Sequence, residues 1–401
     1  MGNKKYLIPL TYIGAMYFTV GFTMGINSYL LPLLQSTLEV SAGESYLVLA
    51  ATFSAFLLFG YPSSFLIKKI GYKRTMALAF AIYAIGFTMF ISSAHRCSLS
   101  LFLLASFLCG TGNAVLQAAI NPYVTILGPI ESAAKRMSIM GICNAFAWPT
   151  APIILSLIIG KNIEEVALID ITKPFLIISV ISLILSVVML FAPLKEIKAK
   201  GEDEAHWDDC PYAAHKKSIL QFPHLLIGCI TLFFYVGVET IASATTVDYA
   251  ADLGLSNPDR YAVYPSIGMV TGYICGILFI PKLVSQKMAL TVCTYIAVTG
   301  TLLVVFSPPE ISIVCITVIS LGCSLMYPSL WPLAIVDLGR FTKTGSSLLV
   351  TSIVGGAVIP TCFGFLKDKV GSQDAYWLCL PCFLFILFYA RHGCKIRTDS
   401  K

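Results

Sequence analysis

Charged residues are scarce in this sequence. Asp, Glu, Lys and Arg make up 12% of its 401 residues, whereas apolar residues make up 57%. A soluble domain carries about 25% charged residues, so the composition excludes an ordinary soluble domain. It is typical of a protein that crosses the membrane many times.

Chemical motifs of the common enzyme classes are also missing. No phosphate-binding loop, nucleophile–base set or metal-ligand cluster stands out, so neither an enzyme nor a cofactor is expected. The net charge of +6 lies in the loops and gives no reason to expect nucleic acid. We expect no cleavable signal peptide, because the first apolar run is too long and lacks a small-residue cleavage site.

The thirteen cysteines show no disulfide pattern, since most lie inside apolar runs, where a thiol behaves as a small hydrophobe. Cys379 and Cys382 form a CxxC without a nearby histidine. His206, Cys210 and His215 could be drawn together as ligands, but their spacing is a weak signal. No metal site is predicted.

Twelve apolar runs of membrane-spanning length organise the chain. They cover Tyr6–Leu34, Ser45–Ile67, Thr75–Ala94, Ser98–Leu127, Met137–Gly160, Pro174–Leu194, Ile219–Val247, Tyr261–Val284, Met288–Phe306, Ile311–Leu338, Gly345–Leu366 and Ala375–Ala390. The one long hydrophilic interval falls in the middle. It predicts an N-terminal six-helix bundle over residues 1–194, a solvated linker with a short surface helix over 195–218, and a C-terminal six-helix bundle over 219–401.

The basic residues predict the orientation. With the N-terminus inside, all but six of the 27 Lys and Arg residues fall on cytoplasmic stretches. Cytoplasmic loops of membrane proteins carry this excess, so both termini are expected in the cytoplasm. The six on the outer side are Arg96, Lys161, Lys173, Arg260, Lys367 and Lys369.

The two halves repeat each other. Val20-Gly21 in the first run corresponds to Val236-Gly237 in the seventh, and Leu127-Gly128 corresponds to Leu338-Gly339. Two related six-helix halves indicate a transporter whose site lies near mid-membrane between them. Prolines inside the runs are predicted bending points for alternating access, with simple packing as the alternative: Pro122, Pro149, Pro328, Pro332 and Pro360.

Polar side chains inside the runs are the candidate site residues. Asn113, Gln117 and Asn121 are four residues apart and share one helix face. Amides are costly in hydrocarbon unless they are paired, so this stripe either lines a polar pathway or joins neighbouring helices. Glu239 is an ionisable residue inside the seventh run, which favours a functional role over a structural anchor.

Several motifs resemble a known family. GYPSSFLIKKIGYKR (60–74) is similar to the loop signature of the major facilitator superfamily, with Ser64 at a usual glycine and Lys68 at a usual acid. LQAAINPYVTILGP (116–129), CNAFAWPTAP (143–152), FYVGVET (234–240), MYPSLWPLAIVDLG (326–339) and GSSLLVTSIVGGAVIP (345–360) resemble the fucose:proton symporter family within it. The resemblance implies a twelve-helix permease for fucose, glucose, galactose or related hexoses, usually driven by a cation gradient.

Two departures bear on coupling. The resemblance implies acids at positions where this chain has Ser28 and Gln117. Neither side chain can carry a proton, so Glu239 becomes the proton-coupling candidate. Uncoupled facilitated diffusion, an amino-sugar substrate paired with Glu239, and a non-transporting sugar sensor remain as alternatives.

The predicted fold is an all-α membrane protein with twelve transmembrane helices in two pseudo-symmetric six-helix bundles. Amides and a carboxylate would bind sugar hydroxyls, and aromatic faces would cover the C–H side of the ring, with interhelical packing or an interfacial belt as the alternative for the aromatics.

Partners would be a sugar, a proton or sodium ion and the lipid bilayer; we expect a monomer in the bacterial inner membrane. The predicted substrate-binding residues are Asn27, Gln117, Asn121, Asn144, Trp148, Tyr235, Glu239, Tyr327 and Trp331.

Overall fold

Helices make up all the regular secondary structure of the described residues. The computed structural model describes residues 4–38, 42–161, 166–198, 210–256 and 258–396. Within these, eleven helical stretches are long and apolar enough to cross a membrane, and Leu47–Phe59 is a shorter apolar helix. This agrees with the predicted twelve-helix fold.

Contacts divide the chain into two compact units. Unit 1 contains Met1–Leu127, Cys143–Ile197 and Ser346–Thr351; unit 2 contains Gly128–Ile142, Lys198–Gly345 and Ser352–Lys401. The helix α5 is therefore divided between the units: its first ten residues belong to unit 2 and the rest to unit 1. The predicted division at the central linker stays a prediction.

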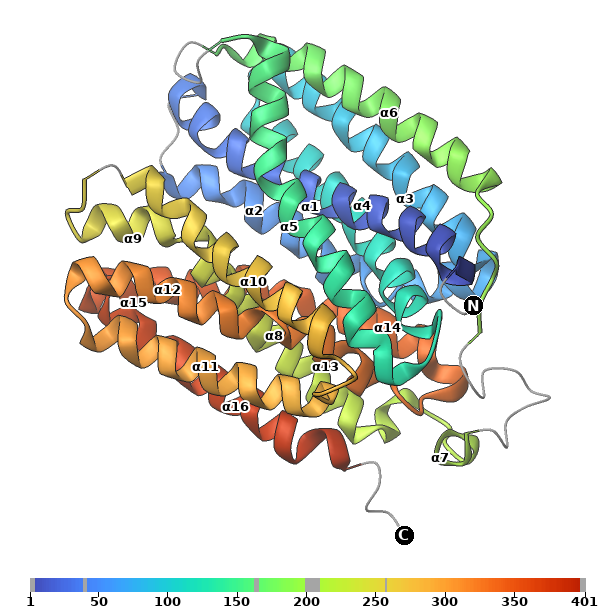
Figure 1. The fold of residues 1–401 in the computed structure, drawn as a ribbon. Coiled ribbons are helices and arrows are strands. Elements are labelled where there is room, and N and C mark those ends of the chain that lie inside the picture. The colour runs from blue at the N-terminus through green and yellow to red at the C-terminus, as the bar shows by residue number, and fades with distance from the viewer. Residues whose placement is uncertain (1–3, 39–41, 162–165, 199–209, 257, 397–401) are drawn as a thin grey trace. The chain divides into compact units, whose positions relative to one another are not determined.

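Unit 1 is built around α4. Every residue of α4 from Cys109 to Thr125 is buried, and the helix packs against α1, α2 and α3, while α3 also packs along α6 (Figure 1). The bounds are α1 (Lys4–Leu38), α2 (Ala42–Phe59), α3 (Ser63–Arg96), α4 (Leu99–Ile126), α5 (Ala133–Ile159) and α6 (Thr172–Phe191). The polar stripe predicted from the sequence thus lies in the core helix of its unit.

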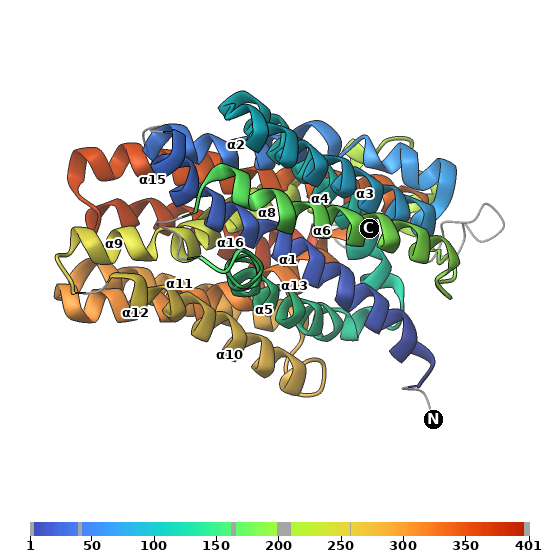
Figure 2. The ribbon, with the colours of Figure 1, turned by 90° about the horizontal axis from the view of Figure 1, so that it is seen from above.

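Unit 2 is centred on α8 and α11. The helix α8 packs on α13, α15 and α16, and α11 packs on α12 and α16 (Figures 1 and 2). The bounds are α7 (Pro211–Ala214), α8 (Pro223–Ala244), α9 (Thr246–Asp252), α10 (Val263–Phe279), α11 (Gln286–Phe306), α12 (Pro309–Ser324), α13 (Met326–Ile335), α14 (Thr342–Thr351), α15 (Gly355–Val370) and α16 (Cys379–Arg391). The helix α14, like α5, is divided between the units.

Short 3₁₀ helices connect or cap the longer ones. They are η1 (Ile130–Ser132), η3 (Leu168–Ile171), η5 (Ile219–Gln221), η6 (Pro258–Ala262), η7 (Gly339–Phe341), η8 (Ser352–Val354), η9 (Asp374–Leu378) and η10 (Gly393–Lys395). The helix α7 is the short surface helix predicted in the central linker.

Several predicted runs are interrupted in the structure; Gly345–Leu366, for example, is divided between α14 and α15 by η8. The run Ser45–Ile67 is interrupted, because α2 ends at Phe59 and α3 begins at Ser63, after Pro62. The run Ile311–Leu338 breaks at Leu325, between α12 and α13. Pro328 has no N–H to donate to the carbonyl four residues earlier, at Ser324, and this missing hydrogen bond favours the break seen there.

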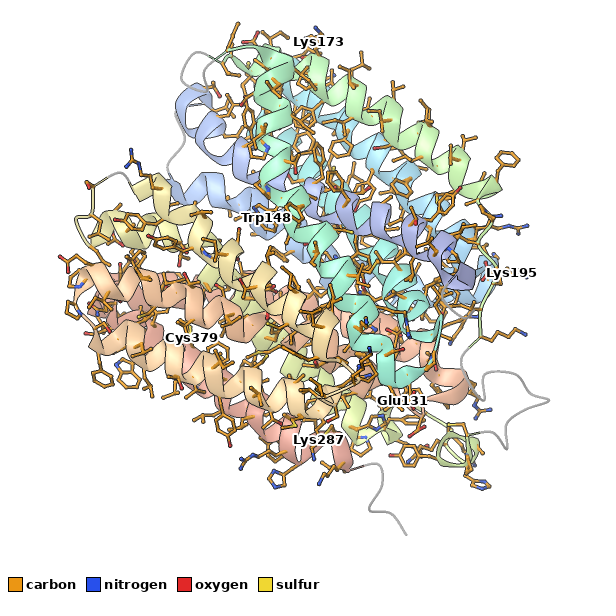
Figure 3. The ribbon with its side chains drawn as sticks, viewed as in Figure 1. Glu131, Trp148, Lys173, Lys195, Lys287 and Cys379 are labelled. Atoms are coloured by element: carbon orange, nitrogen blue, oxygen red, sulfur yellow. The ribbon has the colours of Figure 1, made fainter. Side chains whose placement is uncertain are left out.

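The start of the linker is fastened to the turn before the main part of α3. Gly71 has a φ of 82°, a left-handed conformation that favours glycine. The N–H groups of Tyr72 and Lys73, which follow it, donate to the carboxylate of Glu196 at 2.9 and 3.0 Å. The Tyr123 hydroxyl donates to the carbonyl of Lys195 at 2.9 Å, and Lys195 is labelled in Figure 3. The carboxylate thus satisfies two N–H groups at the start of a helical segment.

Glycines set the closest helix contacts in each unit. A Cβ on Gly21 of α1 would collide with the carbonyl oxygen of Asn144 on α5, and a Cβ on Gly355 of α15 would collide with that of Phe233 on α8. Within each unit, a glycine thus lets a helix approach the backbone of its neighbour.

Candidate functional site

The amide stripe of α4 is held at both ends by tyrosines. The Tyr83 hydroxyl donates to the side-chain Oδ1 of Asn113 at 2.7 Å, and the Tyr17 hydroxyl donates to the side-chain Oδ1 of Asn121. Both asparagines are fully buried. Asn113 therefore anchors α4 to α3, and Asn121 anchors α4 to α1. These two amides join neighbouring helices, which was one of the two roles considered for the stripe.

Gln117 differs from its two neighbours on the stripe. Its side chain is only 9% exposed, yet within the described part of the chain its amide makes no hydrogen bond. The oxygen and nitrogen of its side-chain amide keep some surface accessible to solvent. A nearly buried amide with open donors and acceptors is costly unless water or a ligand pairs with it.

Asn144 and Trp148 lie one turn apart on α5. Asn144 is half-buried, and its amide nitrogen donates to the carbonyl of Tyr17 at 3.2 Å. Trp148 is 36% exposed, and it is labelled on α5 in Figure 3. Gly25 of α1 lies against its backbone. Both residues thus keep part of their surface exposed in the structure.

Asn27 is placed differently. It is 3% exposed, and its amide nitrogen donates to the Thr52 hydroxyl at 3.2 Å, which joins α1 to α2. Ser28, where the family resemblance implied an acid, lies in α1, but its side chain is outside the described residues.

In unit 2, one carboxylate lies among aromatic side chains. Glu239 lies in the C-terminal part of α8, five residues before its end, and is half-buried. It interacts electrostatically with Tyr235, Tyr273 and Cys323. The Tyr235 hydroxyl is buried near Glu239 but forms no hydrogen bond with the described residues.

Three predicted aromatic residues form one cluster beside this carboxylate. The rings of Tyr235 and Tyr327 are 6.1 Å apart, and those of Tyr327 and Trp331 are 5.5 Å apart. Trp331 is fully buried, and its indole N–H has no partner in the described residues. Aromatic faces next to open polar groups are what a sugar ring needs, since it presents hydroxyls at its edge and C–H bonds on its faces.

Tyr273 belongs to the same group but was missed from the sequence. It comes from α10, is 7% exposed, and interacts with both Glu239 and Tyr327. A Cβ on Gly141 would fall 2.6 Å from its ring, so Gly141 leaves the space that the tyrosine fills. A single tyrosine between the glycines of GMVTGYICG is the signal that could have pointed to it.

Tyr17 was also missed. It donates from its hydroxyl to Asn121 and accepts at its carbonyl from Asn144, so it links two predicted site residues of unit 1. Its position four residues before Gly21, in the Val-Gly pair that is repeated at Val236-Gly237, is a signal for it. The predicted assignment of the nine residues to a substrate site stays a prediction.

The described residues contain no group of three His, Cys, Asp or Glu side chains that could hold a metal ion. Cys210 is buried and His215 is exposed, whereas His206 lies outside the described residues.

Comparison with known proteins identifies the family. Residues 13–361 match the model of the Major Facilitator Superfamily. The chain is 31% identical to a "Glucose/galactose transporter" of Brucella abortus, over 98% of this chain and 96% of that protein. It is 23% identical to the "L-fucose-proton symporter" of Escherichia coli, over 99% and 95%. These relatives are transporters and not enzymes.

Solved structures show the same fold. The crystal structure of the transporter FucP in the outward conformation matches with a TM-score of 0.82 at 22% identity, over 97% of this chain and 99% of that chain. A proton:xylose symporter bound to 6-bromo-6-deoxy-D-glucose matches with a TM-score of 0.76 at 12% identity, over 96% of each chain. With its helical spans, its repeated halves and the match over most of its length, the chain belongs to the major facilitator superfamily.

Proposed function

We propose that this protein is a monosaccharide permease that moves a hexose of the glucose, galactose or fucose type by alternating access, in symport with a proton. The relatives named for glucose, galactose and fucose support the substrate class. It would work in the bacterial inner membrane with both termini in the cytoplasm.

The observation that carries the proposal is the placement of Glu239. A carboxylate within an apolar helix, next to Tyr235, Tyr273 and the ring cluster of Tyr327, can bind a proton or accept a hydrogen bond from a sugar hydroxyl. In this proposal, Gln117 and Asn144 are further candidate sugar ligands, and protonation of Glu239 accompanies sugar binding.

The experiment uses the purified protein in liposomes. Addition of hexose outside should make the external medium alkaline if sugar and proton enter together. Glu239→Gln should abolish this proton movement while sugar exchange across the membrane persists. The matched control is Glu310→Gln, because Glu310 is exposed at the start of α12 and its removal should leave proton movement unchanged. Sugar uptake without proton movement at any pH would contradict coupling.

A second function, uncoupled facilitated diffusion, is favoured by the non-titrating Ser28 and Gln117. It predicts equal initial rates with and without a proton or sodium gradient. An amino-sugar substrate, paired as a cation with Glu239, would instead show as stronger competition by amino sugars than by neutral hexoses.

A further inference from the structure

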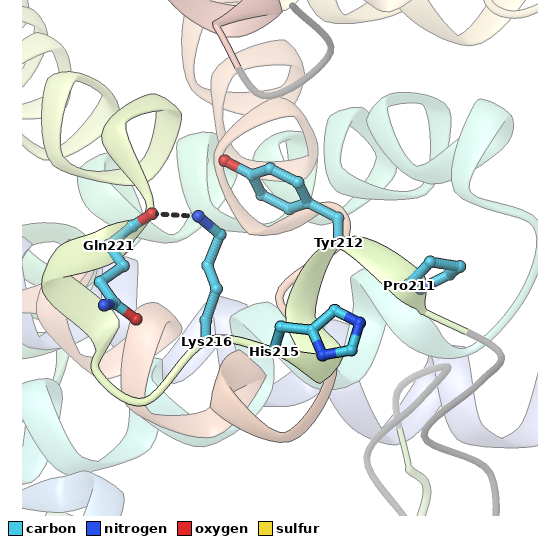
Figure 4. A pocket seen from close by; sticks show the side chains of 5 residues that line it. All are labelled: Pro211, Tyr212, His215, Lys216 and Gln221. Carbon is cyan, nitrogen blue, oxygen red and sulfur yellow. Dashed lines mark hydrogen bonds between the residues drawn. The ribbon is translucent and has the colours of Figure 1, made fainter. Parts of the chain in front are cut away.

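A polar hollow lies beside α7, just before the membrane-spanning helix α8. It has a volume of about 480 Å³ and is lined by Pro211, Tyr212, His215, Lys216 and Gln221 (Figure 4). None of these side chains is acidic. We call it the α7 hollow; none of its residues belongs to the candidate sugar site.

Lys216 is fixed in place within the α7 hollow. Its ammonium donates to the carbonyl of Gln221 at 2.8 Å and lies 4.5 Å from the centre of the Tyr212 ring and 5.4 Å from that of Phe222. The Arg340 guanidinium donates to the carbonyl of Lys216 at 2.7 Å. An ammonium has three N–H donors, and the described residues use one of them, so two remain available to a further acceptor.

The surroundings of the hollow combine positive charge with an exposed apolar residue. His215 and Lys217 flank Lys216 and are exposed. Leu220 is 68% exposed although it lies only three residues before the span that begins at Pro223. A leucine at this position is suited to the edge of the hydrocarbon layer, and the basic side chains would then lie at the depth of lipid headgroups.

We propose that the α7 hollow binds the phosphate of an anionic phospholipid headgroup, with the acyl chains beside Leu220. The charge of Lys216 attracts the phosphate, and its two open N–H groups donate to the phosphate oxygens. The proposal rests on the proposed cytoplasmic position of the linker, where the inner leaflet carries anionic lipids. A soluble phosphate monoester shares the same chemistry, and the test separates the two sources.

The test measures lipid adducts on the full chain by native mass spectrometry. The wild-type protein should retain phosphatidylglycerol in preference to phosphatidylcholine. Lys216→Met keeps the apolar stem on the rings but removes the charge. It should weaken phosphatidylglycerol binding by about fivefold, the effect of one basic residue near a charged membrane surface. The matched control is Lys282→Met, because Lys282 is exposed in the loop between α10 and α11, and it should bind like the wild type.

Equal phosphatidylglycerol binding by the wild type and Lys216→Met, or equal loss in Lys282→Met, would overturn the proposal. Competition by inorganic phosphate with the same sensitivity to Lys216→Met would support the anion site and assign it to a soluble phosphate. The binding assay needs no transport, so a failure of the lipid site and a failure of the permease proposal are separate results.

Discussion

At the scale of single residues, the three amides of α4 share a helix face but have different roles. Asn113 and Asn121 accept from tyrosines that lie on other helices, whereas Gln117 makes no hydrogen bond in the described part of the chain. The local pattern is the same for all three, so only the neighbours in space separate an anchor from a candidate ligand.

This difference gives the first prediction at the residue scale. Gln117→Leu should leave thermal stability nearly unchanged and raise the KM for hexose about fivefold, because a lost hydrogen bond to a sugar hydroxyl costs about 1 kcal/mol. Asn121→Leu should instead lower the stability by about 1–3 kcal/mol, because it leaves the buried Tyr17 hydroxyl without its acceptor. Thermal unfolding in detergent and radiolabelled uptake in liposomes measure the two effects.

The reverse pattern, with a stable Asn121→Leu and a KM unchanged in Gln117→Leu, would show that the tyrosine-bound amides and not Gln117 face the substrate.

The sequence could predict part of the candidate site. Glu239, Tyr235, Tyr327 and Trp331 stand out as polar or aromatic residues inside apolar runs, and the structure places them in one cluster. Tyr273 could not be grouped with them, because its proximity depends on how α10 packs and on the space left by Gly141. Helix periodicity fixes which face a residue lies on, but not which helix that face meets.

At the scale of helices, α15 offers two glycines in contrasting surroundings. A Cβ on Gly355 would collide with the carbonyl oxygen of Phe233, whereas nothing lies within 4 Å of a Cβ on Gly364. Gly355→Ala should therefore destabilise the protein by about 1–3 kcal/mol through overpacking against backbone that cannot move easily. Gly364→Ala should be neutral or slightly stabilising. Thermal unfolding of both variants makes the comparison, and equal melting temperatures would show that α8 and α15 do not approach this closely.

The contact of Glu196 with α3 supports a second prediction for the helices. Glu196→Ala removes the acceptor for the N–H groups of Tyr72 and Lys73 and should cost about 1 kcal/mol, as the loss of a helix cap does. Glu131 is exposed in η1 and accepts no hydrogen bond from the described residues through its side chain, so Glu131→Ala is the matched control. Denaturation midpoints that are the same for both variants would contradict a capping role.

The sequence predicted the number and order of the helical spans better than their ends. Length and hydropathy are properties of the sequence itself, so the twelve runs correspond to the observed spans. The breaks near Pro62 and at Leu325 were missed because apolar composition continues through them. The hydrogen bonds from two backbone N–H groups to the Glu196 carboxylate could not be predicted either, since Tyr72 and Glu196 are 124 positions apart in the sequence.

At the scale of the whole molecule, the arrangement of the basic residues and the exposure of the cysteines can be tested together. Of the 13 cysteines, Cys97 and Cys362 are exposed. Cys97 lies in the loop after Arg96, which is predicted to be outside, and Cys362 lies within the apolar span that contains α15. Lipid should cover Cys362 but not Cys97.

A membrane-impermeant maleimide applied to intact cells should therefore label the wild-type protein at one position. The variant Cys97→Ser should lose the label, and Cys362→Ser should keep it. Because the spans alternate in direction, an external Cys97, after three crossings, requires the N-terminus to be inside, and twelve crossings then return the C-terminus to the same side. Labelling of Cys97 only after the cells are permeabilised would reverse the orientation of every loop. It would also place the α7 hollow on the outer face, away from the inner-leaflet lipids proposed to bind there.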